Sequence, residues 1–220
     1  MSKLFYNFIF LLTILVTLSA FLFFFNTEWY RYLIQEDGVL ENITALILLF
    51  GSFLAMSRIR KFDRKKHPWR IVLYVFLSLG LLFAFGEEIS WGQRIFNTET
   101  PEFFSENNLQ KETNIHNLEF NGIKFNRVFS IVMTIGFSIY FLLFLPLYQR
   151  QLWISQILDR FGVPVPRIHH SILIILSTLV IVSIPDSKIW EIWECAVALI
   201  LFLTLYYPFN ESAVRSIEKS

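Results

Sequence analysis

The sequence predicts an all-α membrane protein, a polytopic bundle of about six transmembrane helices. The 220 residues are 55% hydrophobic and 18% aromatic, with a mean hydropathy of +0.51, whereas a soluble domain has roughly 45–50% apolar residues. The apolar residues also form long blocks, which is typical of membrane spans. Such blocks must be helical, because a backbone in hydrocarbon has no water to bond. Residues 1–220 are therefore expected to form a single integral membrane domain.

Six apolar segments define the expected spans. They cover residues 4–25, 39–56, 71–90, 128–148, 171–185 and 189–208. The fifth is short, so it either begins nearer Ile168 or lies in a thinned region. The first segment has a basic start and small residues at positions 17–20, as a secretory signal has. Its apolar stretch is longer than a usual signal core, so we interpret it as a retained anchor.

The basic residues predict the orientation. Most of the 19 Lys and Arg residues lie before the first span, between spans two and three, after span four and in the tail. Basic residues accumulate on the cytoplasmic side, so both termini are expected there. The long loop at residues 97–126 is then external.

Composition excludes several classes of protein. The net charge of +1 gives no sign of nucleic acid as a partner. The single cysteine, Cys195, excludes an internal disulfide and a thiolate zinc cluster. No phosphate-binding glycine loop, nucleophile elbow or H-E-x-x-H motif is present. The adjacent His169 and His170 fall at the cytoplasmic edge and are expected to be interfacial.

Carboxylates at helix ends are the first functional signal. The apolar run from Ile71 to Gly86 gives only about 24 Å of helix, against a hydrocarbon core of about 30 Å. The helix must therefore continue through Glu87 and Glu88, which point about 100° apart and enter the edge of the apolar slab. Ionisable groups at such depth are a functional-site hypothesis by default.

Two other helices bring acids to the same external level. Asp37 and Glu41 are spaced i,i+4 at the start of span two, and Glu191 and Glu194 are spaced i,i+3 in span six, so each pair shares a helix face. The sequence therefore predicts that acids from three helices converge in one pocket. The structural alternative is that they meet lipid headgroups or pair with basic residues such as Arg94.

The external loop can add polar groups to this pocket. Gln110, Glu112, Asn114 and His116 occupy alternate positions, and alternate side chains of an extended backbone point to one side. Folded back as a lid, the loop would place His116 above the carboxylates. The alternative is an ordinary solvated loop.

Two stretches carry a resemblance. "GEEISWGQRIF" (86–96) and "NLQKETNIHN" (108–117), with an "EDG..E" opening of span two at 36–41, resemble a group of uncharacterised bacterial multi-pass membrane proteins. The resemblance implies a location in the bacterial cytoplasmic membrane (the cell inner membrane) and supplies no reaction. It adds Gln93, Gln110, Asn114 and Asn117 to the candidate residues.

The favoured functional hypothesis is a metal-assisted hydrolase or transferase that acts on a lipid or lipid-linked substrate. Carboxylates and a histidine are ligands for a divalent metal ion, which could activate water. The expected catalytic residues are Glu87, Glu88 and Arg94, with Arg94 holding a headgroup. The expected substrate-binding residues are Trp91, Gln93, Gln110, Asn114 and Asn117, and the expected metal ligands are Glu41, Glu87, Glu88, Glu112, His116 and Glu194.

Two other functions stay open. A non-catalytic subunit could use the cluster to fix its helices and the loop to bind a membrane-protein partner. A proton- or cation-coupled transporter could also use buried carboxylates. The sequence has no inverted repeat or matched broken helices, which makes transport the weakest of the three.

Overall fold

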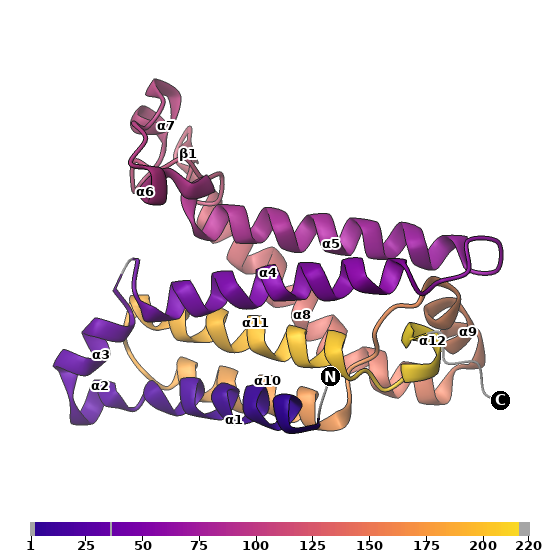
Figure 1. Ribbon diagram of the computed structural model, residues 1–220. Coiled ribbons are helices and arrows are strands. Elements are labelled where there is room, and N and C mark those ends of the chain that lie inside the picture. The colour runs from indigo at the N-terminus through magenta and orange to yellow at the C-terminus, as the bar shows by residue number, and fades with distance from the viewer. Residues whose placement is uncertain (1–2, 36, 216–220) are drawn as a thin grey trace.

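The computed structural model describes residues 3–35 and 37–215 and is all-α apart from one small β-hairpin (Figure 1). Within those residues the N-terminal half forms α1 (Lys3–Ser19), α2 (Leu22–Phe25), α3 (Thr27–Leu33), α4 (Val39–Ile59) and α5 (Pro68–Glu88). The segment between α5 and the C-terminal half forms a 3-10 turn (Ser90–Gly92), α6 (Gln93–Phe96), α7 (Glu102–Asn107), β1 (Glu119–Phe120) and β2 (Ile123–Lys124). The C-terminal half forms α8 (Phe125–Arg150), α9 (Leu152–Phe161), α10 (Ile168–Val182), a 3-10 turn (Ser187–Ile189), α11 (Trp190–Tyr206) and α12 (Glu211–Arg215).

The central helix of the bundle is α11. It is buried over most of its surface, and α1, α4 and α10 pack around it (Figure 1). The α5 helix packs on the outer side of α4 as its antiparallel neighbour. The Ser52 hydroxyl on α4 donates to the Ser78 carbonyl at 2.8 Å, and the Ser78 hydroxyl donates to the Ser52 carbonyl at 3.2 Å. Such small hydroxyl residues allow membrane helices to approach closely.

The expected all-helical architecture is confirmed, and each expected span coincides with a helix. Within the described residues three helices, α4, α5 and α8, are long and apolar enough to cross a membrane, while α1 and α10 are apolar but shorter. The expected first span, 4–25, is interrupted. Its helix ends at Ser19, whose hydroxyl donates to the Val16 carbonyl at 2.6 Å, and such local bonds compete with helix continuation.

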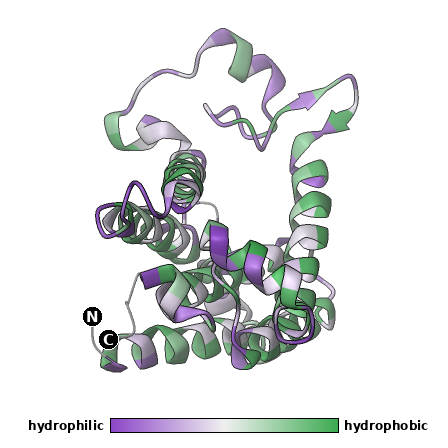
Figure 2. Ribbon diagram, turned by 90° about the vertical axis from the view of Figure 1, so that its right-hand side faces the viewer, coloured by the Kyte–Doolittle hydropathy of each residue, from purple (hydrophilic) through white to green (hydrophobic). Residues whose placement is uncertain are grey.

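The α8 helix stands partly away from the bundle. Its C-terminal half packs on α9 and α10, where Phe141 and Leu145 are buried. Its first turns behave differently, since residues 127–133 are exposed all the way round the helix. Figure 2 shows the segment between α5 and α8 arching from one helix to the other. This segment carries the second motif stretch.

The opposite end of the bundle is held by arginines. The Arg58 side chain is 4% exposed and donates to the Tyr74 hydroxyl at 3.1 Å and to the Tyr206 carbonyl at 3.3 Å. Arg215 donates to the same carbonyl at 2.8 Å. Cations favour the carbonyl end of a helix, so these side chains complete the C-terminus of α11. Arg58 is one of the basic residues between the expected spans two and three, yet its side chain is buried.

Candidate functional site

The site begins where α5 ends. Three successive residues, Ser90, Trp91 and Gly92, have positive φ angles of 47°, 55° and 80°. A left-handed backbone costs roughly 1–2 kcal/mol for a residue with a Cβ, so Ser90 and Trp91 must be held by other contacts. The helix ends at Glu88 with Ile89 as its C-cap, and the left-handed turn follows directly.

The Trp91 side chain is folded back onto the last turn of α5. Its ring lies against Gly86, where an added Cβ would come within 2.9 Å of the indole, and it makes an edge contact with Phe83. The Trp91 Nε1–H group donates to Glu87 Oε1 at 2.8 Å. Gly86 is therefore required for this ring to reach the carboxylate.

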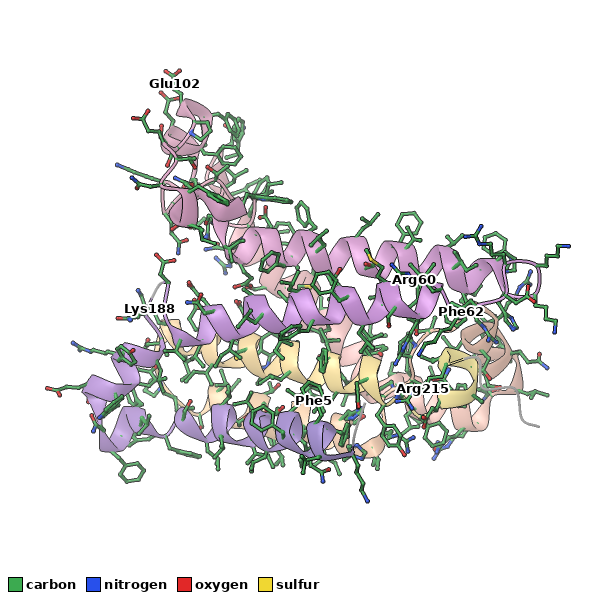
Figure 3. All side chains as sticks on the ribbon, viewed as in Figure 1. Phe5, Arg60, Phe62, Glu102, Lys188 and Arg215 are labelled. Carbon is green, nitrogen blue, oxygen red and sulfur yellow. The ribbon has the colours of Figure 1, made fainter. Side chains whose placement is uncertain are left out.

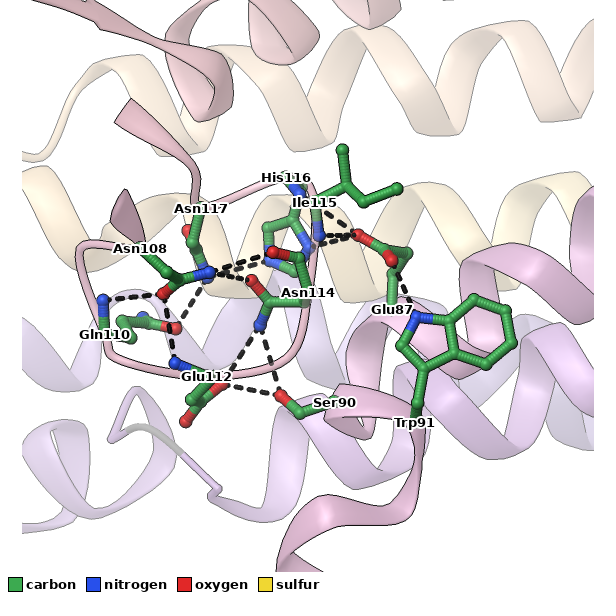
Figure 4. Close-up of polar contacts among 10 residues, drawn as sticks. All are labelled: Glu87, Ser90, Trp91, Asn108, Gln110, Glu112, Asn114, Ile115, His116 and Asn117. Atoms are coloured by element: carbon green, nitrogen blue, oxygen red, sulfur yellow. Dashed lines mark hydrogen bonds and ion pairs between the residues drawn. The ribbon is translucent and has the colours of Figure 1, made fainter. Parts of the chain in front are cut away.

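Glu87 is the point at which the two motif stretches meet (Figure 4). Its Oε2 accepts the backbone N–H groups of Ile115 at 2.6 Å and of His116 at 3.0 Å. The His116 Nδ1 atom lies 3.3 Å from the same oxygen. A carboxylate accepts, so a neutral His116 carries its proton on Nδ1, and Nε2, 3.1 Å from Asn117 Nδ2, is the accepting nitrogen. Glu87 thus orients the His116 ring.

Asparagine side chains fold the loop between residues 108 and 117 into a series of turns. Asn108 Nδ2 donates to the Asn114 carbonyl and to Asn114 Oδ1, and Asn108 Oδ1 accepts the backbone N–H groups of Gln110 and Glu112. The expected extended backbone is therefore wrong. Local side-chain bonds replace it, as is common for asparagine. The loop nevertheless packs against the end of α5.

A second contact between loop and helix end involves Glu112. Its Oε2 accepts the Ser90 hydroxyl at 2.6 Å and Asn114 Nδ2 at 3.0 Å. The Asn114 side chain is 1% exposed and also donates to the Ser90 hydroxyl at 3.1 Å. These bonds fix Ser90 in its left-handed conformation and satisfy a buried amide.

The remaining amides of the motif also make bonds within the loop. Gln93 donates to the Thr100 hydroxyl at 2.5 Å and accepts the Thr113 backbone N–H at 2.7 Å. Asn117 Nδ2 donates to Gln110 Oε1 at 2.6 Å. Gln93, Gln110, Asn114 and Asn117, expected to bind substrate, are thus engaged with the protein itself.

The other acids lie on the bundle side of Glu87. Glu88 is close enough to Glu194, Glu191 and Glu41 for their charges to interact. Acids of α4, α5 and α11 therefore lie near one another around Glu88, and their convergence in one pocket stays a prediction. Glu41 also has a structural role, because its Oε2 accepts the Asp37 backbone N–H at 2.6 Å, before the first turn of α4.

Accessibility distinguishes Glu194 from its neighbours. It is exposed, although Trp193 and Cys195 on either side of it in α11 are buried. The Glu88 side chain is partly buried. A carboxyl group on the central helix is therefore reachable from outside the bundle.

Two expected roles are not supported by the contacts described above: the headgroup clamp at Arg94 and the single set of metal ligands. The side chain of Arg94 lies outside the described part of the chain, so its role as a headgroup clamp stays a prediction. The expected metal ligands are divided, since His116 adjoins Glu87, Glu112 bonds Ser90, and the other carboxylates lie around Glu88. Across residues 3–35 and 37–215, no group of three or more His, Cys, Asp and Glu residues is arranged to hold a metal ion.

A separate polar cluster lies near the other end of α11. The Tyr6 hydroxyl is 2.5 Å from His169 Nε2 and 2.9 Å from His170 Nε2, and His170 Nδ1 is 3.0 Å from the Thr204 hydroxyl. His170 is fully buried within the bundle, and the interfacial level of the two histidines stays a prediction. The pair joins α1, α10 and α11.

Sequence reasoning missed Ser90, Asn108 and the two backbone N–H groups that Glu87 accepts. Asn108 had a usable signal, since asparagine is favoured where its side chain bonds the backbone two residues ahead. The other contacts depend on the left-handed turn after α5, which no local pattern marks. Comparisons with protein-family models, with curated proteins and with solved structures found no match to this chain.

Proposed function

We propose that this chain is a membrane enzyme, a hydrolase or transferase that uses acid–base catalysis on a lipid or lipid-linked substrate at the outer side of the membrane. The observation that carries the proposal is the pairing of His116 with Glu87. A carboxylate that holds an imidazole in one tautomer is a recurrent arrangement of catalytic bases. Here Glu87 is a positioning residue and His116 is the base. Its Nε2 accepts from Asn117 Nδ2 in this structure and exchanges that bond for the proton of water or substrate.

Glu88 and Glu194 would supply the acid. When carboxyl groups share an apolar site, like-charge repulsion keeps one of them protonated. In the proposed reaction, His116 removes a proton from water or a substrate hydroxyl, whose oxygen attacks an acyl or phosphoryl centre. The protonated carboxyl of the Glu88–Glu194 pair then gives its proton to the leaving oxygen. The exposure of Glu194 supports access of a substrate to this pair.

A lipid is the favoured substrate class because apolar surface flanks the arch between α5 and α8. The first turns of α8 are exposed on every side, and Phe83 and Val132 on the two helices that flank the arch are exposed apolar residues. Lipid chains are the natural neighbours of such surfaces in a membrane. A divalent metal ion stays a prediction for this site, and the reaction above uses no metal-dependent step.

Lipid profiling of the source cells with and without the gene tests the proposal. We expect one lipid species to accumulate in the deletion strain and to return to normal with the wild-type gene. His116→Gln and Glu88→Gln should fail to restore it at equal protein abundance, since loss of an acid or base costs about 10²–10⁴ in rate. Glu106→Gln, at an exposed loop position, is the matched control and should restore it fully.

Two outcomes would overturn the enzyme proposal. An unchanged lipid profile in the deletion strain would remove lipid as the substrate class. If His116→Gln and Glu88→Gln complement fully, the cluster is structural. The second candidate, a non-catalytic subunit, would then be favoured, since the exposed half of α8 offers a surface for a partner helix.

The proposal includes six membrane crossings with both termini in the cytoplasm of a bacterial cell. The distribution of Lys and Arg supports it. Since Cys195 is buried, introduced cysteines can be labelled selectively. A membrane-impermeant maleimide should label Glu106→Cys in intact cells and Lys65→Cys only after the membrane is opened. The reverse result would invert the orientation.

A further inference from the structure

The segment between α5 and α8 has an apolar side that no part of the enzyme proposal uses. Phe103 on α7 is 51% exposed, Phe120 on β1 is 48% exposed, and Ile123 on β2 is 56% exposed. The rings of Phe103 and Phe120 lie 6.5 Å apart. Phe120 pairs directly with Ile123 across the hairpin, and directly opposed residues share a face. These three residues form one continuous surface, the hairpin patch.

The opposite face of the hairpin is charged, and Glu102 on α7 also points away from the patch. Glu119 pairs with Lys124 across the hairpin, and their side chains form an ion pair at 4.0 Å. Neighbouring residues of a strand point to opposite faces, so this pair faces away from Phe120 and Ile123. On α7, Glu102 lies about 100° round the helix from Phe103. Figure 3 shows Glu102 at the tip of the segment, pointing away from the helices.

The position of the hairpin along the chain limits what can cover the patch. Strand β2 ends at Lys124, and α8, one of the helices able to cross a membrane, begins at the next residue. At the other end, α6 follows α5 after a single turn, and its Ile95 and Phe96 are 68% and 74% exposed. The segment is thus tied at both ends to helices of membrane-spanning length and stays at the level where they leave the bilayer.

We propose that the hairpin patch inserts into the outer leaflet of the bilayer, at the boundary between headgroups and acyl chains. Aromatic side chains concentrate at this boundary, and an amphipathic element lies there with its apolar side down. The acids of the segment outnumber its bases, so the favoured surface is neutral or zwitterionic. The charged side, with Glu102 and Glu119, faces water.

Spin-label accessibility in the full-length protein tests this insertion. Phe103→Cys and Ile123→Cys report on the patch, and Glu102→Cys and Lys124→Cys are matched controls from the same two elements. The label attaches to these exposed positions, while the buried Cys195 stays unreacted, as unsubstituted protein will verify. Each variant is reconstituted in phosphatidylcholine vesicles and must melt at the wild-type temperature.

The expected result is a clear division between the two sides. Labels at positions 103 and 123 should collide with lipid-soluble oxygen more than with a water-soluble nickel complex, placing them about 5–10 Å below the headgroup surface. Labels at positions 102 and 124 should favour the nickel complex. Equal nickel accessibility at all four positions would overturn the proposal. Spin–spin broadening with low access to both agents at the patch would also overturn it and would identify a second copy as the occupant.

Discussion

The clearest test of the site architecture is Glu87→Gln, which removes the charge that joins the loop to α5. The Glu87 carboxylate accepts from Trp91 Nε1, from the backbone N–H groups of Ile115 and His116, and from His116 Nδ1, at 2.6–3.3 Å. A glutamine has one accepting oxygen and places an NH₂ group where the second oxygen was. On one side the glutamine NH₂ group therefore faces an N–H donor that has lost its acceptor. On the other side the remaining hydrogen bonds are made to a neutral oxygen and no longer to a charged one.

The magnitude follows from those bonds. Hydrogen bonds to a charged group contribute roughly 1.5–3 kcal/mol each, and a donor left without an acceptor costs roughly 1–3 kcal/mol. Losing one bond and weakening the rest should reduce the docking free energy of the loop by about 3 kcal/mol. Because about 1.4 kcal/mol is a factor of ten, the loop amides should exchange about 100-fold faster.

Hydrogen–deuterium exchange of the protein in nanodiscs measures this effect directly. Peptides that cover residues 108–118 should lose protection in Glu87→Gln, whereas peptides from α11 should be unchanged, because the loop is outside the core. Glu106→Gln removes a carboxylate from the same segment at an exposed position and should exchange like wild type. Unaltered exchange of the Ile115 and His116 amides in Glu87→Gln would refute the role assigned to this carboxylate.

Two further predictions concern the end of α5 and the loop between α4 and α5. Gly86→Ala should lower the stability of the folded protein by about 1–3 kcal/mol in detergent melts, because its Cβ meets an indole ring at 2.9 Å. Gly80→Ala, in the same helix with no atom within 4 Å of the added Cβ, should not destabilise it, and equal effects would contradict this reasoning. The backbone N–H groups of Lys66 and Lys65 hold the pKa of the exposed Asp63 carboxyl below its ordinary value. The ionised Asp63 carboxylate therefore stabilises this turn at pH values above the ordinary aspartate pKa, and the stabilisation is lost as the pH falls through the lowered pKa. The amide NMR shifts of Lys65 and Lys66 should accordingly titrate at a lower pH than an aspartate in the unfolded chain does.

The helices were predictable because their signal is local. An apolar block must be helical in hydrocarbon, and five of the six blocks contain a helix whose bounds lie near the predicted ones, while the first is divided. The break after Ser19 was not predictable from apolarity, since it depends on which backbone carbonyl a hydroxyl bonds. The burial of Arg58 was missed for a similar reason. Its partner is the carbonyl of Tyr206, far away in sequence, at the end of another helix.

For the site, the sequence could predict which residues come together but not how they are hydrogen-bonded. Depth arguments indicated that Glu87 and Glu88 need compensation, and loop spacing indicated that His116 could reach them. The hydrogen bonds to Glu87 could not be predicted from the sequence, because they require Trp91 in a left-handed conformation that its residue type disfavours. Only with that turn do the indole and the loop amides face the same carboxylate.

The two adjacent glutamates illustrate why a pair can serve two purposes. Successive residues of a helix point about 100° apart, so Glu87 and Glu88 reach different surroundings from one helix end. Glu87 meets a ring of N–H donors from the loop, and Glu88 meets the carboxyl groups of α4 and α11. The first contact holds His116 in place, and in the proposed reaction the second provides the acid. A Glu87 that exchanged protons would no longer be a steady acceptor for the loop N–H groups.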